Sequence, residues 1–184
     1  MGVRYEVLLL RNTVNRRDVN ESPHANESPA DYVQRIAIAK AQVGWQLVTQ
    51  RKLAHYPVLG ADTSVTLNGE IFGKPGNITI AIDMLNKLSG RTHQVTTTVA
   101  LIYQSQTRHL TSTSEVTFKS LSAAEIKHYA ASGEALDKAG AYAIQGRAAS
   151  FIQHLNGSYS GVMGLPIFET ATLLDQMHVN KKMA

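Results

Sequence analysis

The dipeptide Asn68-Gly69 constrains the fold of this chain more than any other local feature. It separates a β-favouring run at residues 58–67 from the short run Glu70-Ile71-Phe72. Both residues tolerate the positive φ angles that a two-residue hairpin loop requires. The pattern therefore predicts an antiparallel pair in which Leu67 faces Glu70, and such a pair excludes a purely parallel sheet.

Helical and strand patterns alternate along the rest of the chain. Ser28-Pro29 joins a capping hydroxyl to a proline at the first helical position, which predicts a helix over residues 29–49. Further elements are expected as helices at 77–88, 122–132 and 167–177 and as strands at 4–10, 96–103 and 109–119. A second hairpin is expected around Asn156-Gly157. The predicted fold class is α/β, with a mixed twisted sheet and flanking helices.

The composition is that of an ordinary globular protein. The chain has 184 residues, of which 43% are hydrophobic and 17% are charged, so we expect one domain over residues 1–184. No apolar run is long enough to cross a membrane, and no apolar signal core is recognisable. We therefore expect a cytoplasmic protein without a membrane partner. The absence of cysteine excludes disulfides, thiolate zinc sites and cysteine nucleophiles.

The charge pattern argues against a nucleic-acid partner. There are 18 Lys and Arg against 14 Asp and Glu, a net charge of +4, and the excess is spread along the chain. Aromatic residues are few and do not alternate with basic ones, as they do in single-strand-binding proteins. A small polyanionic ligand such as a nucleotide suits this balance better. The chain has no phosphate-loop, dinucleotide or nucleophile-elbow motif.

Asp62 is the most conspicuous polar residue, because it falls inside a β-favouring run. A carboxylate there must be paired, hydrogen-bonded, metal-bound or exposed in a cleft, unless it caps the end of the strand. Counting outward from the predicted turn places Thr63 opposite Lys74, so Lys74 would lie close to Asp62. An Asp and a Lys together suit a phosphate and metal site, but they could equally form a surface ion pair.

Two further polar residues interrupt apolar surroundings. Lys40 lies in the apolar stripe of the first predicted helix, where it either extends along the rim to solvent or presents an ammonium to a phosphate. Gln145 lies among small residues, where its amide either hydrogen-bonds the backbone or recognises the edge of a base.

Several segments together resemble the Maf family of nucleoside triphosphate pyrophosphatases. They occur in order within about residues 32–174, at 60–63 (Gly-Ala-Asp-Thr), 73–75 (Gly-Lys-Pro), 84–93, 137–146 and 157–166. Asp62-Thr63 and the Ala-Ile-Gln-Gly stretch at 143–146 resemble the subgroup that acts on dTTP and UTP.

The resemblance implies hydrolysis of a pyrimidine nucleoside triphosphate to its monophosphate and pyrophosphate. Asp62 would accept the proton of the attacking water, and Lys40 and Lys74 would hold phosphates. Thr63 and Gln145 would set substrate preference. The resemblance also implies a divalent cation, Mg or Mn, near Asp62, a homodimer, and two lobes around a central cleft.

The amino-terminal segment departs from the family pattern. Family members usually open with a strand, a Ser-x-Ser-Pro-Arg-Arg loop and a helix, whereas residues 2–7 here resemble the segment that follows that helix. We therefore expect an N-terminally shortened Maf-like domain, in which Glu21 is the acidic neighbour of the metal. The alternative function is a catalytically impaired nucleotide-binding or interaction protein, because lost arginines remove phosphate contacts.

Overall fold

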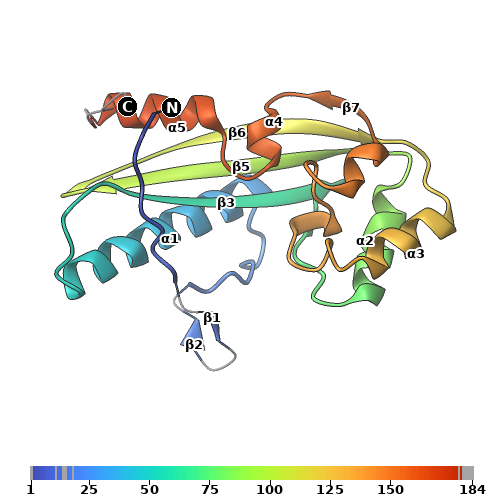
Figure 1. The fold of residues 1–184 in the computed structure, drawn as a ribbon, viewed down its shortest axis with the longest axis horizontal. Coiled ribbons are helices and arrows are strands. Elements are labelled where there is room, and N and C mark those ends of the chain that lie inside the picture. Colours follow the sequence, from blue (N-terminus) through green and yellow to red (C-terminus); the bar gives the residue numbers. More distant parts are fainter. Residues whose placement is uncertain (1, 11, 14–15, 18, 178, 180–184) are drawn as a thin grey trace. The chain divides into compact units, whose positions relative to one another are not determined.

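The computed structural model describes residues 2–10, 12–13, 16–17, 19–177 and 179. The elements are β1 (Asn12–Thr13), β2 (Arg16–Arg17), α1 (Pro29–Gln50), β3 (Val58–Leu67), β4 (Glu70–Phe72), α2 (Ile78–Leu88), β5 (Thr92–Tyr103), β6 (Gln106–Phe118), α3 (Ala123–Ala131), two 3-10 helices (Ala139–Ala141 and Arg147–Phe151), β7 (Ile152–Asn156), α4 (Tyr159–Val162) and α5 (Ile167–Gln176). Figure 1 shows them along the chain. None of the helices in these ranges is long and apolar enough to span a membrane.

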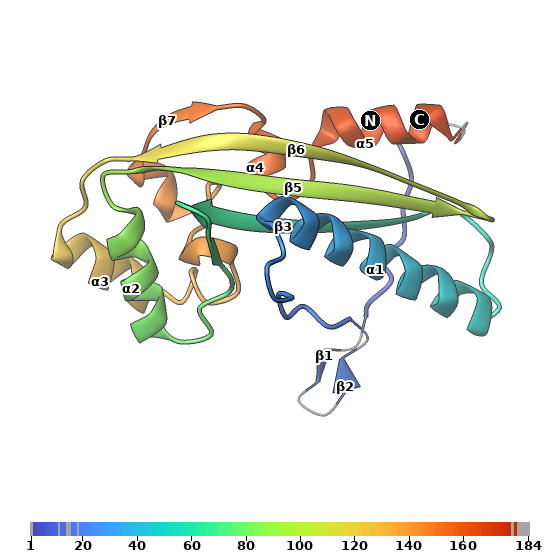
Figure 2. The same ribbon diagram turned by 180° about the vertical axis from the view of Figure 1, so that it is seen from behind.

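A five-stranded sheet in the order β4-β3-β5-β6-β7 organises the fold (Figures 1 and 2), and β1 and β2 form a separate pair. The ladders β3–β4 and β6–β7 are antiparallel. The chain divides into two compact units, and each of the long strands β3, β5 and β6 contributes residues to both. The predicted α/β class with flanking helices is confirmed, whereas the sheet, expected to be mixed, is antiparallel.

The first unit comprises the described parts of 1–62, 98–111 and 165–184. Its helices cover opposite faces of the strands (Figures 1 and 2). Ala37 and Ala41 of α1 pack with Ala100 and Ile102, whereas α5 packs with Val99 and Leu101. This division follows from the alternation of side chains along β5, because odd and even residues of a strand face opposite sides.

The second unit comprises residues 63–97 and 112–164 and has one core. The predicted Asn68-Gly69 turn is confirmed there, with φ angles of 51° and 83° and with Leu67 opposite Glu70. The predicted capping box of α3 is also present, since Ser122 and Glu125 bond each other's backbone. Whether the two units function as one Maf-like domain over 1–184 remains a prediction.

The strand predicted at residues 4–10 is wrong. These residues are described and form neither helix nor strand. Tyr5, Val7 and Leu9 are 84%, 74% and 77% exposed. A high β propensity produces a paired strand only where the side chains are buried against neighbours, and these side chains are not.

The hairpin predicted around Asn156-Gly157 is also wrong. Asn156 ends β7 and pairs with Glu115 of β6, and the chain then turns into α4, whose capping residue is Ser158. Gly157 does have a positive φ of 130°, and a Cβ there would lie 2.5 Å from Oγ of Ser114. The dipeptide therefore makes a tight strand-to-helix turn against β6.

Candidate active site

Asp62 lies inside β3, four residues after its first residue, so the alternative of a strand-end cap is wrong. Its side chain is only 12% exposed, and its Oδ1 accepts a hydrogen bond of 2.6 Å from Nζ of Lys40. A carboxylate this deeply placed needs a charged partner, because burial without one carries a large desolvation cost. The strand and the helix α1 supply the two halves of that pair.

Lys40 holds two carboxylates at once. Its Nζ lies 2.9 Å from Oε1 of Glu21 in addition to its contact with Asp62, and its side chain is 23% exposed. The ammonium is therefore turned inward rather than extended to solvent. Burial alone would lower the pKa of Lys40, but the Asp62 and Glu21 carboxylates outweigh burial and raise it. Lys40 thus stays charged at neutral pH.

The close approach of α1 to β3 explains why Lys40 reaches Asp62. Gly60 faces the helix, and a Cβ there would lie 2.6 Å from the backbone N of Ala41 and 2.7 Å from the carbonyl O of Ala37. A glycine on the strand and alanines on the helix leave no side-chain layer between them. The lysine next to Ala41 therefore lies directly beside the strand that carries Asp62.

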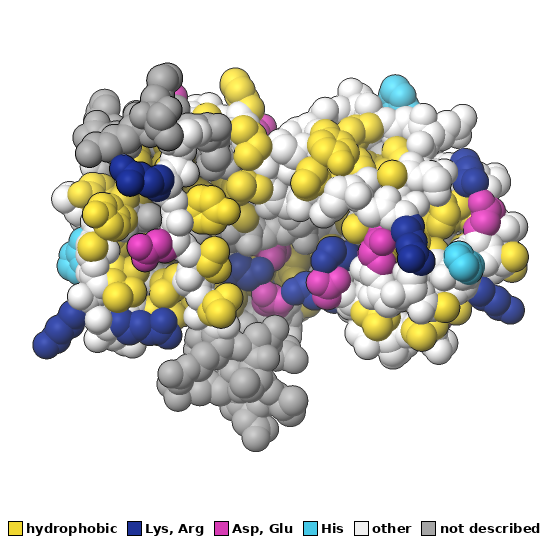
Figure 3. Space-filling model, in the orientation of Figure 1, with side chains coloured by type: hydrophobic (Ala, Val, Ile, Leu, Met, Phe, Trp, Pro, Cys, Tyr) yellow, Lys and Arg dark blue, Asp and Glu magenta, His cyan; other side chains and the backbone are white. Residues whose placement is uncertain are grey.

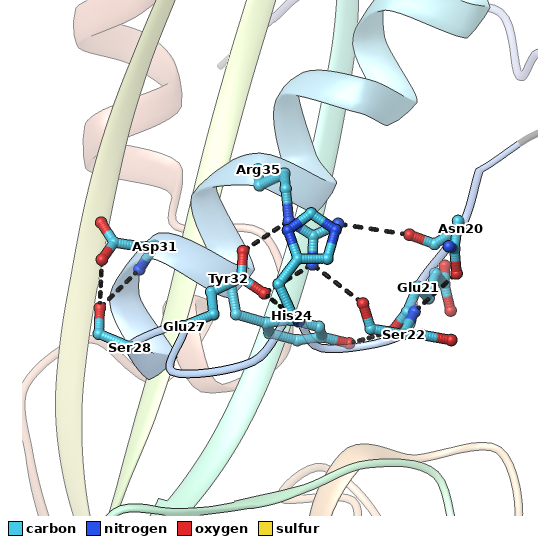
Figure 4. Close-up of polar contacts among 9 residues, drawn as sticks. All are labelled: Asn20, Glu21, Ser22, His24, Glu27, Ser28, Asp31, Tyr32 and Arg35. Carbon is cyan, nitrogen blue, oxygen red and sulfur yellow. Dashed lines mark hydrogen bonds and ion pairs between the residues drawn. The ribbon is translucent and has the colours of Figure 1, made fainter.

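A loop at residues 19–27 brings Glu21 to the cluster, and Figure 4 shows how α1 holds it. Arg35 bonds both carboxylate oxygens of Glu27, at 2.5 and 2.7 Å. Its guanidinium also donates to the carbonyl oxygens of Asn20 and Ser22, at 3.4 and 3.1 Å. These contacts join the start and the end of the loop to one helical side chain.

Tyr32 adds a further bond to this loop, because its Oη donates to the carbonyl oxygen of Glu21 at 3.0 Å. Burial and then the carboxylates of Asp62 and Glu21 raise the pKa of Tyr32, so the phenol stays protonated and remains a donor. The hydrogen bond from Arg35 lowers the pKa of Glu27 to about 2. At neutral pH the phenol of Tyr32 is therefore protonated and the carboxylate of Glu27 is ionised, as their hydrogen bonds require.

Asp62 and Glu21, the two residues expected to neighbour a metal ion, both contact Nζ of Lys40. Among the described residues no three or more His, Asp or Glu side chains are grouped to hold a metal ion. Proteins usually bind Mg²⁺ through one or two carboxylates together with substrate phosphates and water. The carboxylates of Asp62 and Glu21, which both contact the Lys40 ammonium, are close enough together to fit that pattern. The oxygen donors are right for Mg²⁺ or Mn²⁺, and the rest of the coordination would come from the ligand.

The other predicted site residues lie in the second unit. Thr63 follows Asp62 in β3, so it faces the opposite side of the strand, and its Oγ1 lies 2.9 Å from Oγ1 of Thr97. The ladder between β3 and β4 ends at Phe72, two residues before Lys74, so strand pairing does not place Lys74 against Asp62. Lys74 and Gln145 are both exposed.

Sequence reasoning missed Tyr32, Glu27 and Arg35. A usable signal existed, because residues 32 and 35 are three apart on a helix and share a face. The sequence pattern does not predict the path of the loop at residues 19–27. That path determines which backbone carbonyl groups Arg35 bonds.

The surface agrees with the modest charge excess. On the face drawn in Figure 3, Lys and Arg side chains are interspersed with Asp and Glu side chains. The fold and the cluster together describe an α/β protein with a charged site suited to a polyanionic ligand.

Comparison with known proteins places the chain in a family. Residues 3–177 match the family model of Maf-like proteins, and the chain belongs to that family. It is 52% identical over 181 residues to a dTTP/UTP pyrophosphatase of Nitrosomonas europaea, covering 98% of this chain and 87% of that protein.

Two further relatives are similarly close. A dTTP/UTP pyrophosphatase of Nitrosospira multiformis is 54% identical over 177 residues, which are 96% of this chain and 86% of that protein. A nucleoside triphosphate pyrophosphatase of Haemophilus ducreyi is 51% identical over 162 residues, which are 88% of this chain and 82% of that protein. Both confirm the resemblance to the Maf family.

Proposed function

We propose that this protein is a nucleoside triphosphate pyrophosphatase that hydrolyses dTTP and UTP to the monophosphate and pyrophosphate. The family membership and the names of relatives about half identical to the chain support this activity. The structural observation that carries it is the cluster in which Lys40 binds both Asp62 and Glu21. The cluster combines a proton acceptor with a cation, which phosphoryl transfer needs more than a covalent nucleophile.

Asp62 acts as the proton acceptor in this proposal. Water attacks phosphorus, the bridge between the α- and β-phosphoryl groups breaks, and pyrophosphate leaves while the water proton passes to a carboxylate oxygen of Asp62. A carboxylate accepts a proton only when it is ionised, and the Lys40 ammonium at 2.6 Å favours the ionised form. Asp62 and Glu21 take two of the three N–H groups of Lys40, and the third is offered to a phosphate oxygen.

A divalent cation, Mg or Mn, is part of the proposal, with Asp62 and Glu21 as the residues that would hold it. Such an ion supplies neutralisation of phosphate charge when bound. The two carboxylates contribute hard oxygen donors from β3 and from the loop before α1. Lys40 lies between the same two carboxylates, with its Nζ 2.6 Å from Asp62 and 2.9 Å from Glu21.

The remaining site residues stay predictions that rest on the family resemblance. Lys74 would hold phosphate, and Thr63 and Gln145 would set the preference for dTTP and UTP. A homodimer, a cytoplasmic location, the two lobes around a cleft, and the absence of nucleic-acid and membrane partners are likewise part of the proposal.

A pyrophosphate-release assay on dTTP, UTP, CTP, ATP and GTP with Mg²⁺ or Mn²⁺ tests the activity. We expect turnover of dTTP and UTP above the others, and a loss of about a hundredfold or more in Asp62→Asn, because removal of a catalytic proton acceptor has that scale. Asp83→Asn is the matched control, since Asp83 is exposed on α2. No turnover with any nucleotide would overturn the proposed function, and full activity of Asp62→Asn would overturn the role of Asp62.

A further inference from the structure

Side chains of α1 bond the backbone on both sides of Glu21 and at Glu21 itself. The carbonyl oxygens of Asn20, Glu21 and Ser22 accept bonds from Arg35, Tyr32 and Arg35 in turn, at 3.4, 3.0 and 3.1 Å. Three consecutive carbonyl groups thus meet donors from a single helical turn (Figure 4). A backbone bonded at three consecutive carbonyl groups has little freedom to change its φ and ψ angles, so the direction of the Glu21 Cα–Cβ bond is fixed.

Arg35 itself is held in place by Glu27. Both carboxylate oxygens of Glu27 accept from the guanidinium, and the Glu27 side chain is only 8% exposed. Oε2 of Glu27 also accepts from the backbone N–H of His24 at 3.0 Å, so the same carboxylate closes the loop. The planar guanidinium offers five N–H groups in a fixed fork, and this site uses its Nε and both of its terminal nitrogens.

We infer that Arg35 is a positioning residue: held by Glu27, it fixes the backbone on both sides of Glu21 and so keeps the Glu21 carboxylate against Lys40 and Asp62. This role rests on the proposed function only where turnover is the readout. Arg35 need touch neither the substrate nor the reacting atoms. It acts through Glu21, whose Oε1 lies 2.9 Å from Nζ of Lys40.

The first test needs no activity. Amide hydrogen exchange of the whole protein is compared between the natural chain and Arg35→Lys. A lysine keeps the charge but cannot meet Glu27 and two carbonyl groups together. We expect exchange at the N–H groups of His24 and Glu27, in the loop before α1, to rise about tenfold or more, with exchange in α1 itself unchanged. Unchanged exchange at these two groups would overturn the inference.

The second test is a double-mutant cycle on turnover. Arg35→Gln and Arg35→Lys should each lower turnover about tenfold or more, as loss of a residue that orients a ligand-binding side chain does. If Arg35 acts through Glu21, Arg35→Gln should cause almost no further loss in Glu21→Gln. Arg51→Gln, an exposed arginine at the end of the same helix, should leave turnover unchanged within twofold.

The two tests separate this inference from the proposed function. Natural turnover in Arg35→Lys would mean that charge alone suffices and would overturn the inference. The same fold-loss from Arg35→Gln with and without Glu21 would overturn it too. If the natural chain hydrolyses no nucleotide, the proposed function fails, and the exchange measurement alone decides the role of Arg35.

Tyr32→Phe removes only the hydrogen bond to the Glu21 carbonyl oxygen. It should therefore change amide exchange less than Arg35→Lys does, in a protein that is fully folded.

Discussion

At the scale of single residues, Lys40 decides the charge balance of the site. Its ammonium lies within 3 Å of two carboxylates from different parts of the chain. Without a cation these carboxylates would repel each other in a partly buried place. One lysine therefore stabilises the fold locally and keeps the site ready for an anionic substrate.

Lys40→Met tests this balance. We expect turnover of dTTP to fall about a hundredfold or more, because the variant loses the ammonium that we propose binds phosphate. The free energy of unfolding should fall by roughly 2 kcal/mol, the scale of a charged hydrogen bond. Urea unfolding and pyrophosphate release measure the two effects. Lys127→Met on the exposed side of α3 serves as control. Equal free energies of unfolding for the two variants would contradict a stabilising role of Lys40.

His93 controls a different property, the response of stability to pH. The residue is 2% exposed, its Nε2 lies 2.9 Å from Oη of Tyr142, and its buried Nδ1 has no hydrogen-bond partner. Burial lowers the pKa of His93 to about 4. In the unfolded chain the ring takes up a proton near pH 6.5, whereas in the folded protein it does so only near pH 4.

Acidification below about pH 6.5 should therefore destabilise the protein. The stabilisation is complete above pH 6.5 and is lost as the pH falls to about 4, with a total of about 3 kcal/mol. Urea unfolding at several pH values measures it. In His93→Gln the slope over this range should flatten, whereas the exposed His128→Gln should keep it. An unchanged slope in His93→Gln would assign the loss to other groups.

At the scale of elements, the contact of α1 with β3 builds the site. The helix lies against the strand because Gly60 has no side chain and Ala37 and Ala41 have small ones. This packing sets Lys40 beside Asp62, and the first turns of the same helix hold the Glu21 loop. One helix therefore provides both the cation and the supports of the cluster.

Gly60→Ala should disturb stability and activity together. Its Cβ would lie 2.6 and 2.7 Å from the backbone of α1, so the helix must move away. Such overpacking costs typically 1–3 kcal/mol, that is, roughly 2 kcal/mol here. We also expect lower turnover, because Lys40 moves with the helix. Gly73→Ala, where an added Cβ meets nothing within 4 Å, is the control for unfolding; equal unfolding free energies would show that the helix adjusts freely.

At the scale of the whole molecule, the sequence predicts those elements whose start, end or turn is determined by a few neighbouring residues. The helix α1, the Asn68-Gly69 turn and the capping box of α3 follow from caps and turn residues, and the structure confirms them. The strand expected at residues 4–10 fails because pairing depends on burial that only the whole fold decides. The Arg35 contacts were missed for the same reason, since they depend on the path of a loop.

The most direct test of the account is the identity of the products made from dTTP by the natural chain with Mg²⁺. Phosphorus NMR distinguishes cleavage after the α-phosphoryl group from cleavage after the β-phosphoryl group. We predict equal amounts of dTMP and pyrophosphate, and neither product at a comparable rate in Asp62→Asn. Formation of dTDP and phosphate, or an intact dTTP spectrum, would contradict the account.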